Sequence, residues 1–514
     1  MIEPFRPEPF SDFSRSDVAE AYAAALARVQ SQLGRTYPLI IGGQRRLPTR
    51  VIASVNPSQP DQVVGYATQG DQEDAEAAVQ AARTAFPAWS RTPAEVRARI
   101  LFKAAAIMRR RKFELSAWLT FEVGKNWAEA DGDTAEAIDF LEYYGREMIR
   151  LAGSQHLTPI PGEENQLYYR PMGVGVVHSP FNFPLAILCG MSAAAIVTGN
   201  TVVVKPSTEA PVMAAKLFEI LEEAGLPAGV ANLLYADPVE VGDFLTTHKE
   251  VRFITFTGSR QVGCHIYEKA ARVQPGQKFL RRVIAEMGGK DAIIVDGSAD
   301  LDEAAAGIVA SAFGFSGQKC SACSRAVVTA DVYDAVLTRV VERTQALEIG
   351  PAAARETQVG PVAAERFQRK ILEYIAIGKE EGRLVAGGHA VPGGYYVEPT
   401  IFADVAPAAR IAQEEIFGPV LAFVKAADFD EALAIANDTE YGLTGSLYSR
   451  DRAHIEQARV EFLVGNLYFN RKSTGALVGV HPFGGFNMSG TDSKAGGPDY
   501  LLMFTQAQSV SERL

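Results

Sequence analysis

Two of the four cysteines lie three residues apart in a segment that could carry a reactive thiol. Cys320 and Cys323 stand in FSGQKCSACSR (315–325), with a glycine and a lysine before the first thiol. A zinc site would need two more ligands at short spacing, but the other cysteines are isolated and no histidine pairs with this segment, so we expect no metal. A redox dithiol is expected early in a small βα unit. A flexible turn and a cation beside Cys320 favour a thiolate, so Cys320 is the candidate nucleophile and Cys323 a buried apolar residue.

A single acidic residue stands between an apolar run and a glycine turn in IAEMGGKDAII (284–294). Glu286 could be a solvated loop residue, which is the more frequent role of an isolated glutamate at such a place. A carboxylate beside a dry pocket instead has its pKa raised toward neutrality and can activate water. These residues alone leave both interpretations open.

Two glycine-containing turns are candidates for binding a dinucleotide. Gly173 and Gly175 lack the third glycine of the standard fingerprint. The segment FTGSRQVG (256–263) lies between a predicted strand and a predicted helix, so its glycines and the helix N-terminus could hold a pyrophosphate. The signal is weak by itself, because such turns occur throughout α/β proteins.

The elements that must position these residues alternate between β-branched runs and helical segments. The runs predict strands at 174–178, 201–204, 232–235, 252–257 and 291–295. Apolar spacing predicts helices at 18–33, 74–86, 94–123, 185–197, 211–224, 239–247, 301–313 and 333–347. The alternation predicts parallel sheets with crossover helices, in a chain of 514 residues that is too long for one hydrophobic core.

Charge and composition exclude several classes of function. The net charge of −11 provides no basic surface for nucleic acid. Residues 1–13 lack the basic and apolar regions of a secretory signal, and the longest apolar stretch, 185–198, is too short to span a bilayer. Four cysteines do not form a disulfide framework. We therefore expect a cytoplasmic protein that binds neither nucleic acid nor membrane.

Seven motifs, in order along the chain, resemble those of the aldehyde dehydrogenase superfamily. They are SPFNFP (179–184), VKPS (204–207), FTGS (256–259), EMGGK (286–290), GQKC (317–320), EIFGP (415–419) and PFGG (482–485). The resemblance covers about residues 36–510 and implies an α/β fold with a Rossmann-like cofactor domain, an α/β catalytic domain and a small β oligomerisation flap. The implied parts are an N-terminal arm (1–35), the NAD-binding domain (36–151 and 172–286), the catalytic domain (287–467), and the flap and tail (152–171 and 468–514).

The resemblance also implies roles for single residues. Cys320 would attack the aldehyde, Glu286 would activate the water that hydrolyses the thioester, and the side chain of Asn182 with the Cys320 N–H would hold the oxyanion. The expected cofactor is NAD, with NADP possible, because position 208 is Thr where many NAD-preferring relatives carry an acid. The implied cofactor-binding residues are Lys205, Ser207, Gly258, Ser259, Glu415 and Phe417.

Within the superfamily, the string GQKCSACSR, the segment KSTGA (472–476) and the N-terminal arm are most similar to members that oxidise L-glutamate γ-semialdehyde to L-glutamate, the last step of proline catabolism. The implied substrate residues are the carboxylate donors Gly475, Ala476 and Ser321, the stem neighbours Phe183 and Phe483, and Glu136 for the ammonium group. Another small or acidic semialdehyde remains the alternative substrate. A non-catalytic role is disfavoured because Cys320 and Glu286 are both present. A homo-oligomer is expected.

Overall fold

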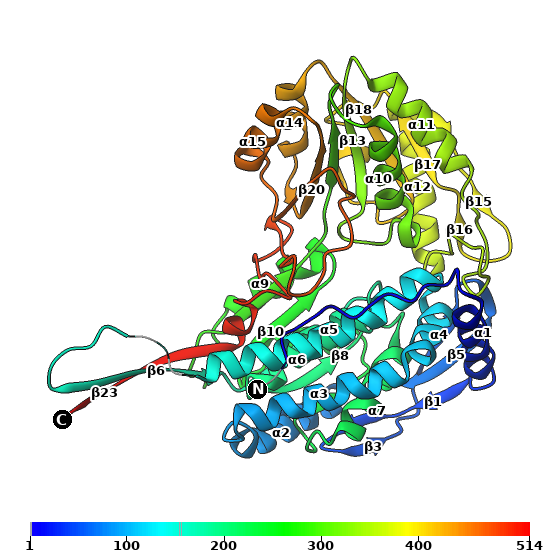
Figure 1. Ribbon diagram of the computed structural model, residues 1–514. Helices are drawn as coiled ribbons and strands as arrows, with labels where there is room; N and C mark the ends of the chain where they lie inside the picture. The colour runs from blue at the N-terminus through cyan, green and yellow to red at the C-terminus, as the bar shows by residue number, and fades with distance from the viewer. Residues whose placement is uncertain (1–2, 154, 156) are drawn as a thin grey trace.

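A computed structural model describes residues 3–153, 155 and 157–514, and two seven-stranded sheets organise them (Figure 1). The first sheet has the strand order β11-β10-β7-β8-β9-β2-β3. Its strands are β2 (Leu39–Ile41), β3 (Gln44–Arg46), β7 (Val174–His178), β8 (Thr201–Lys205), β9 (Ala231–Leu233), β10 (Val251–Thr257) and β11 (Arg282–Glu286). Strands β7 to β11 pair in parallel, and β2 joins antiparallel at the edge. Every residue of β7 and β8 is buried, as expected for apolar strands covered on both faces.

The strand order of the first sheet reverses at β7. Strand β8 lies on one side of β7, and β10 lies on the other. Connections therefore leave these strands in opposite directions, and a crevice opens at their carboxyl ends, where open α/β sheets bind ligands. The residues that end the three strands are His178, Lys205 and Thr257. This edge is where the fold predicts a cofactor site.

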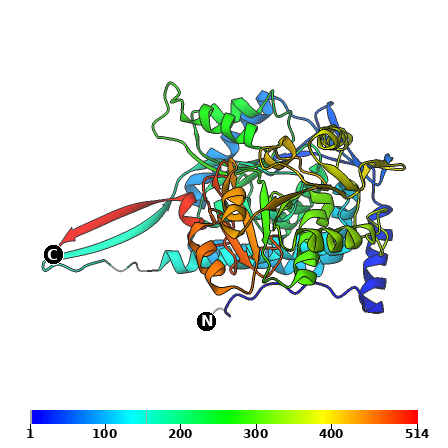
Figure 2. The ribbon, with the colours of Figure 1, turned by 90° about the horizontal axis from the view of Figure 1, so that it is seen from above.

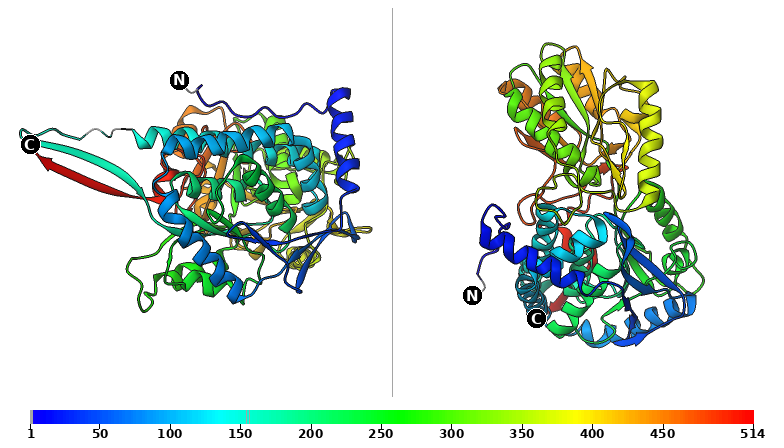
Figure 3. Two further views of the ribbon diagram at one scale, coloured as in Figure 1. Left: turned by 90° about the horizontal axis from the view of Figure 1, so that it is seen from below. Right: turned by 90° about the vertical axis from the view of Figure 1, so that its right-hand side faces the viewer.

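Helices pack against the first sheet and against one another. They are α1 (Ser16–Gln30), α2 (Gln72–Trp89), α3 (Ala94–Arg110), α4 (Lys112–Val123), α5 (Trp127–Ala152), α6 (Ala186–Val197), α7 (Pro211–Ala224), α8 (Gly242–Thr247) and α9 (Arg260–Ala271). Helices α2 and α6 contact β8, and α5 packs on α3 and α6. The N-terminal segment runs along the outside of this lobe to α1, which packs on α4 (Figure 3). No helix in the described ranges combines the length and apolar character needed to cross a bilayer.

The second sheet lies in a separate lobe with the order β14-β17-β18-β13-β12-β20-β21 (Figure 1). Its strands are β12 (Asp291–Val295), β13 (Cys323–Thr329), β14 (Arg383–Ala386), β17 (Thr400–Ala403), β18 (Val420–Ala426), β20 (Thr444–Tyr448) and β21 (Asn466–Phe469). The helices of this lobe are α10 (Leu301–Phe313), η1 (Gly314–Gly317), α11 (Tyr333–Gln345), α12 (Glu365–Glu381), α13 (Arg410–Gln413), α14 (Phe429–Asn437) and α15 (Arg452–Glu461). We propose that the two sheets define the cofactor and catalytic domains. The predicted boundary at 467 falls inside β21, so the second domain extends at least to Phe469.

The remaining strands form small sheets. They are β1 (Arg35–Tyr37), β4 (Val51–Asn56), β5 (Gln59–Thr68), β6 (Glu163–Pro171), β15 (Ala390–Val391), β16 (Tyr396–Val397), β19 (Tyr441–Gly442), β22 (Phe486–Asn487) and β23 (Thr505–Arg513). Strands β6 and β23 pair antiparallel along their whole length and project from the body as an arm (Figures 1 and 2). An isolated two-stranded ribbon is only marginally stable in water and has unpaired edges, which favours pairing with another chain.

One prediction about local structure is wrong, and two other segments are held by contacts that the sequence does not reveal. The helix predicted at 94–123 is interrupted at Arg111, whose backbone (φ −104°, ψ 16°) ends α3 and starts α4. Each of the four basic side chains at 109–112 pairs with a carboxylate, and those of Arg109 and Arg110 remain exposed, which is typical of a solvated helix face. The apolar tail segment η2 (Tyr500–Phe504) packs within the chain, where Tyr500 stacks on Tyr144 with ring centroids 5.4 Å apart and Phe504 is fully buried.

Helix α7 depends on a carboxylate far away in the sequence for its N-terminal cap. This helix follows residues 205–209, at the carboxyl end of β8. Its N-cap residue, Ala210, has no capping side chain. Glu122 of α4 is fully buried and accepts from the N–H groups of Val212 and Met213 at 2.6 and 2.8 Å. We expect Glu122→Ala to lower the melting temperature by about 5 °C, because two buried donors lose their acceptor. Glu223→Ala, on the exposed face of α7, should change it by less than about 1 °C; equal melting of both variants would contradict this role.

Candidate active site

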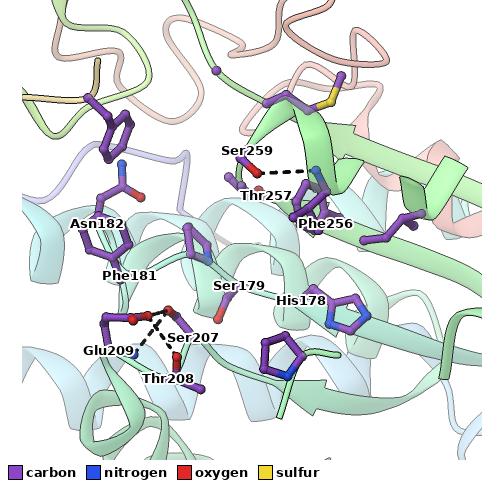
Figure 4. A pocket seen from close by; sticks show the side chains of 18 of the residues that line it. His178, Ser179, Phe181, Asn182, Ser207, Thr208, Glu209, Phe256, Thr257 and Ser259 are labelled. Carbon is purple, nitrogen blue, oxygen red and sulfur yellow. Dashed lines mark hydrogen bonds between the residues drawn. The ribbon is translucent and has the colours of Figure 1, made fainter. Parts of the chain in front are cut away.

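A cavity of about 460 Å³ opens at the carboxyl edge of the first sheet, between the two lobes. It brings together eight of the residues predicted from the sequence: Asn182, Lys205, Ser207, Gly258, Ser259, Cys320, Glu415 and Phe417. Figure 4 shows the part of the wall that follows β7, β8 and β10. Segments that lie far apart in the sequence therefore meet where the strand order reverses, as the topology requires.

Cys320 lies in the loop between η1 and β13, at the amino edge of the second sheet. Gly317 has a positive φ of 68°, and a Cβ there would overlap the carbonyl of Gly418, so the loop requires glycine. Burial raises the pKa of the Cys320 thiol well above its usual range, with smaller contributions from the nearby carboxylates of Asp291, Glu286 and Glu415.

The prediction that Lys319 favours a thiolate is wrong for the isolated chain. Its Nζ pairs with Glu129 at 2.6 Å, which neutralises the cation, while burial keeps Cys320 protonated. Cys323 is buried in the core of the second lobe, where its Sγ donates to the Arg325 carbonyl at 3.3 Å. The cysteine predicted to be structural therefore packs as a core residue.

Asn182 follows β7 and is buried beside the loop that carries the thiol. Its Nδ2 donates to the Gln318 carbonyl at 3.0 Å. Gln318 is fixed in turn, since its Oε1 accepts from the Ala363 N–H at 2.9 Å. The amide of Asn182 is thus tied to the segment immediately before Cys320 and lies in the same cavity wall.

Glu286 is the last residue of β11, and its side chain does not line the cavity. Its Oε1 accepts from the Ser493 hydroxyl at 2.5 Å, and its Oε2 is buried with no hydrogen-bond partner among the described residues. Burial raises the pKa of Glu286 to about 8, although the bonds from Ser493 act in the opposite direction. The interpretation as a solvated loop residue is therefore wrong. The carboxyl group is directed toward Ser493 of the C-terminal segment, and its charge contributes to the raised pKa of Cys320 although it does not line the cavity.

The segment after β8 carries a carboxylate that was not among the predicted site residues. Glu209 accepts from the hydroxyls of Ser207 and Thr208 at 2.8 and 3.1 Å, as Figure 4 shows, and it forms an ion pair with Arg366 of α12. Burial lowers the pKa of neighbouring Lys205 to about 8. Although position 208 lacks an acid, position 209 places one in the same wall of the cavity.

Two glycines allow the second lobe to approach the first. A Cβ on Gly288 would overlap the carboxylate of Glu415, and a Cβ on Gly289 would lie 2.5 Å from the Cys320 carbonyl. The Gly289 N–H donates to Glu415 at 3.2 Å. Phe417 adopts a positive φ of 59°, which turns its ring against Phe181. The EMGGK and EIFGP motifs thus meet at one point of the cavity.

The start of α9 forms another part of the wall. Ser259 caps this helix by accepting from the Val262 N–H at 3.4 Å. Gly258 precedes it, and its N–H donates to the Glu286 carbonyl at 3.1 Å. A helix N-terminus carries partial positive charge and free N–H groups, which suits an anionic group.

The six predicted substrate residues do not line this cavity. Phe183 lies under the buried ammonium of Lys125, whose Nζ is 3.6 Å from the ring centroid. Burial and the neighbouring Asp133 raise the pKa of Glu136 to about 8. Ser473 donates to the Ser321 carbonyl at 3.4 Å, which brings the turn containing Gly475 and Ala476 against the thiol loop. Phe483 forms a short backbone bridge with Ala495. The structure thus brings Ser321 and the turn together, whereas Phe183 and Phe483 have their own, separate partners.

Several site residues were missed. Arg366, Phe367 and Lys370 come from the first turns of α12, and Phe367 stacks on Phe181 at 4.5 Å. Nothing near them in the sequence marks them as part of a site. Ser493 was also missed, although its position in the glycine-rich tail eight residues beyond the PFGG motif was a usable signal.

Comparisons with known proteins show the family to which the chain belongs. The model of the "Aldehyde dehydrogenase family" matches residues 45–510. Proteins named 1-pyrroline-5-carboxylate dehydrogenase from Geobacillus kaustophilus and Bacillus subtilis are 60% and 57% identical over 513 residues, covering the whole of each chain. A crystal structure of 1-pyrroline-5-carboxylate dehydrogenase from Thermus with bound NAD has a TM-score of 0.98 at 53% identity and covers all of both chains. Betaine aldehyde dehydrogenase from Staphylococcus aureus has a TM-score of 0.89 at 28% identity, covering 95% of this chain and 96% of its own. The chain is an enzyme of the aldehyde dehydrogenase family.

Proposed function

We propose that this enzyme oxidises L-glutamate γ-semialdehyde, the open-chain form of 1-pyrroline-5-carboxylate, to L-glutamate with NAD, as the last step of proline catabolism. The observation that carries the proposal is the turn at 473–476, docked beside Cys320. The N–H groups of Gly475 and Ala476 donate to no acceptor in the described ranges, so two backbone donors are free for a carboxylate near the thiol. The full-length relatives named 1-pyrroline-5-carboxylate dehydrogenase support the same substrate.

The residues of the cavity fit NAD. The N-terminus of α9 with Gly258 and Ser259 would hold the pyrophosphate, and Lys205 with Glu209 would contact the adenine ribose. Glu415 and Phe417 would hold the second ribose near Cys320. NAD bound there supplies the hydride acceptor. The bound NAD of the Thermus structure supports NAD as the cofactor.

We assign the chemistry to three side chains. Burial holds Cys320 as a thiol, so its proton would pass to water in the cavity as sulfur attacks the aldehyde carbon. Asn182 Nδ2 and the Cys320 N–H, which donates to no backbone carbonyl in the described ranges, would stabilise the oxyanion of the resulting thiohemiacetal. After oxidation, Glu286 would turn from Ser493 toward the thioester and remove a proton from the attacking water.

Hydrolysis of the thioester should depend on pH through Glu286. Only the ionised carboxylate is a base, so the hydrolysis rate should rise with pH around a midpoint near 8, the pKa set by burial. The Ser493 hydroxyl stabilises the ionised form, and Ser493→Ala should therefore move the midpoint to higher pH. Single-turnover decay of the acyl-enzyme measures this midpoint. A shift to lower pH, or none, would show that Ser493 does not tune the base.

Glu209 should govern the choice between NAD and NADP. Its carboxylate would repel a 2′-phosphate, while its partner Arg366 would attract one. Glu209→Gln should therefore raise the ratio of kcat/KM for NADP to that for NAD by about tenfold. The control is Glu440→Gln, an exposed carboxylate whose partner is Arg260. An unchanged ratio in Glu209→Gln would place the adenine ribose elsewhere.

The substrate is tested with a panel of aldehydes. NADH formation should be at least about a hundredfold more efficient, as kcat/KM, with L-glutamate γ-semialdehyde than with propanal, because only the former has a carboxylate for the turn. Succinate semialdehyde carries a carboxylate on a shorter stem and represents the alternative function. A preference for it, or equal use of all three, would overturn the proposed substrate.

We also propose that the enzyme is a homo-oligomer in which the β6–β23 arm pairs with a second copy. The arm's exposed valine, Val510, and its unpaired strand edges support this role. Sedimentation of the full chain and of the double variant Gln166→Pro/Gln508→Pro, which should form the smaller species, would test it. A monomeric full chain would contradict the proposal.

A further inference from the structure

We infer that Arg471 is a positioning residue for substrate selectivity: it orients the two peptide units whose N–H groups receive the carboxylate. The inference rests on the proposed function of the 473–476 turn. Arg471 lies two residues after the end of β21, and none of the sequence motifs includes it.

The guanidinium binds the turn from the side opposite to its free donors. Arg471 Nη2 donates to the carbonyls of Thr474 and Gly475 at 3.0 and 3.1 Å. All peptide bonds in the described ranges are trans, so each carbonyl points away from the N–H of its own peptide unit. The Thr474 carbonyl belongs to the unit of the Gly475 N–H, and the Gly475 carbonyl to that of the Ala476 N–H. The Arg471 side chain therefore orients the N–H groups of Gly475 and Ala476 away from itself, toward the opposite side of the turn.

Arg471 is itself held in a fixed place. Its guanidinium lies over the ring of Tyr468, 4.3 Å from the centroid, and its Nη1 contacts His481 Nε2 at 3.1 Å. The tautomer of His481 that accepts from Arg471 at Nε2 carries its proton on Nδ1, and this nitrogen lies 3.2 Å from the backbone nitrogen of Leu477, next to the end of the turn. The backbone carbonyl of Arg471 accepts from the Ser446 hydroxyl at 2.6 Å, which anchors the arginine to β20 of the second sheet.

The turn needs this external support. Gly475 has a positive φ of 79° and is exposed, and the carbonyls of the turn have no helix or strand partner. The cation at the oxygen ends of the two peptide units also polarises their N–H groups. Charge-assisted hydrogen bonds are stronger than bonds between neutral groups, so each N–H becomes a better donor. The positive charge of Arg471, behind the two peptide units, also attracts an anion that approaches their N–H groups. Backbone geometry and charge both act toward a carboxylate, and neither acts on an aldehyde without one.

The test compares two substrates in wild type, Arg471→Met and Arg471→Lys. Methionine keeps the stem over Tyr468 but loses both bonds, so KM for L-glutamate γ-semialdehyde should rise by about tenfold to a hundredfold. Its kcat/KM for propanal should stay within about twofold of wild type. Arg471→Lys keeps the positive charge but loses the planar fork of the guanidinium. Its KM for L-glutamate γ-semialdehyde should therefore lie between the values of wild type and Arg471→Met. The Ki of L-glutamate against propanal should rise in Arg471→Met by the same factor as KM.

The control is Arg452→Met, an exposed arginine on α15 that pairs with Glu456 and should leave both substrates unchanged. Equal losses on both substrates in Arg471→Met would mean that Arg471 only stabilises the fold. Full recovery by lysine would assign the effect to charge alone and overturn the orienting role. A wild type without preference for the semialdehyde would overturn the proposed function itself, whereas a preference that survives in Arg471→Met overturns only this inference. If Arg471→Met fails to fold, Arg471→Gln serves in its place.

Discussion

Cys320→Ser is expected to lower kcat for aldehyde oxidation by a factor of at least about 10³, because a hydroxyl is a far weaker nucleophile than a thiol near neutral pH. The Cys320 side chain is one part of a wall built from many residues, so the Kd for NAD should remain within about threefold of wild type. Stopped-flow NADH formation and a fluorescence titration of NAD measure the two quantities on the same preparation.

The matched control for this substitution is Cys323→Ala. Cys323 is buried in the core of the second lobe, so its loss should reduce the melting temperature slightly while leaving kcat within about threefold. An inactive Cys323→Ala together with an active Cys320→Ser would reverse the assignment of the nucleophile.

Glu286→Gln is expected to separate oxidation from hydrolysis. The amide cannot take a proton from water, so steady-state turnover should fall by about 10²- to 10⁴-fold. The amide oxygen that replaces the carboxylate can still accept from Ser493, which keeps the local packing intact. The first turnover should therefore release NADH in a burst of about one equivalent per active site, and the acyl-enzyme should accumulate.

The pH dependence and an exposed control complete this prediction. Glu286→Gln should lose the rise in hydrolysis rate around the pKa of about 8, because the titrating group is gone. Glu456→Gln, on the surface of α15, should keep both the turnover and the pH profile of wild type. A Glu286→Gln enzyme with normal steady-state turnover would remove this carboxylate from hydrolysis.

Much of the framework was predictable, because it depends on patterns that are local in the sequence. Strands β7, β8, β9, β10 and β12 begin within one residue of their predicted positions, since buried parallel strands are continuous β-branched runs. The loop that carries Cys320 was also predictable as part of the cavity, because a glycine turn and a thiol stand side by side in the chain. The break at Arg111 was not, because residues 94–123 keep helical spacing on both sides of it.

The parts of the site that were missed depend on tertiary contacts. Glu209 meets Arg366 across the cavity, and Ser493 reaches Glu286 from the C-terminal segment. The protonation state of the Cys320 thiol was predicted wrongly for the same reason. Lys319 is adjacent in sequence, but in three dimensions it pairs with Glu129. The residue types of the site could be predicted from neighbours along the chain. The protonation of these residues could not, because it depends on burial and on tertiary partners.

The central claim is that L-glutamate γ-semialdehyde becomes a thioester on Cys320, and trapping that species tests it most directly. Glu286→Gln should be mixed with NAD and L-glutamate γ-semialdehyde, quenched in acid and digested for mass spectrometry of the peptide that contains Cys320. We predict one γ-glutamyl group on Cys320, released by hydroxylamine and missing when Cys320 is also replaced by serine. An unmodified Cys320 after NADH release, or the acyl group on Cys323 or elsewhere, would contradict the account.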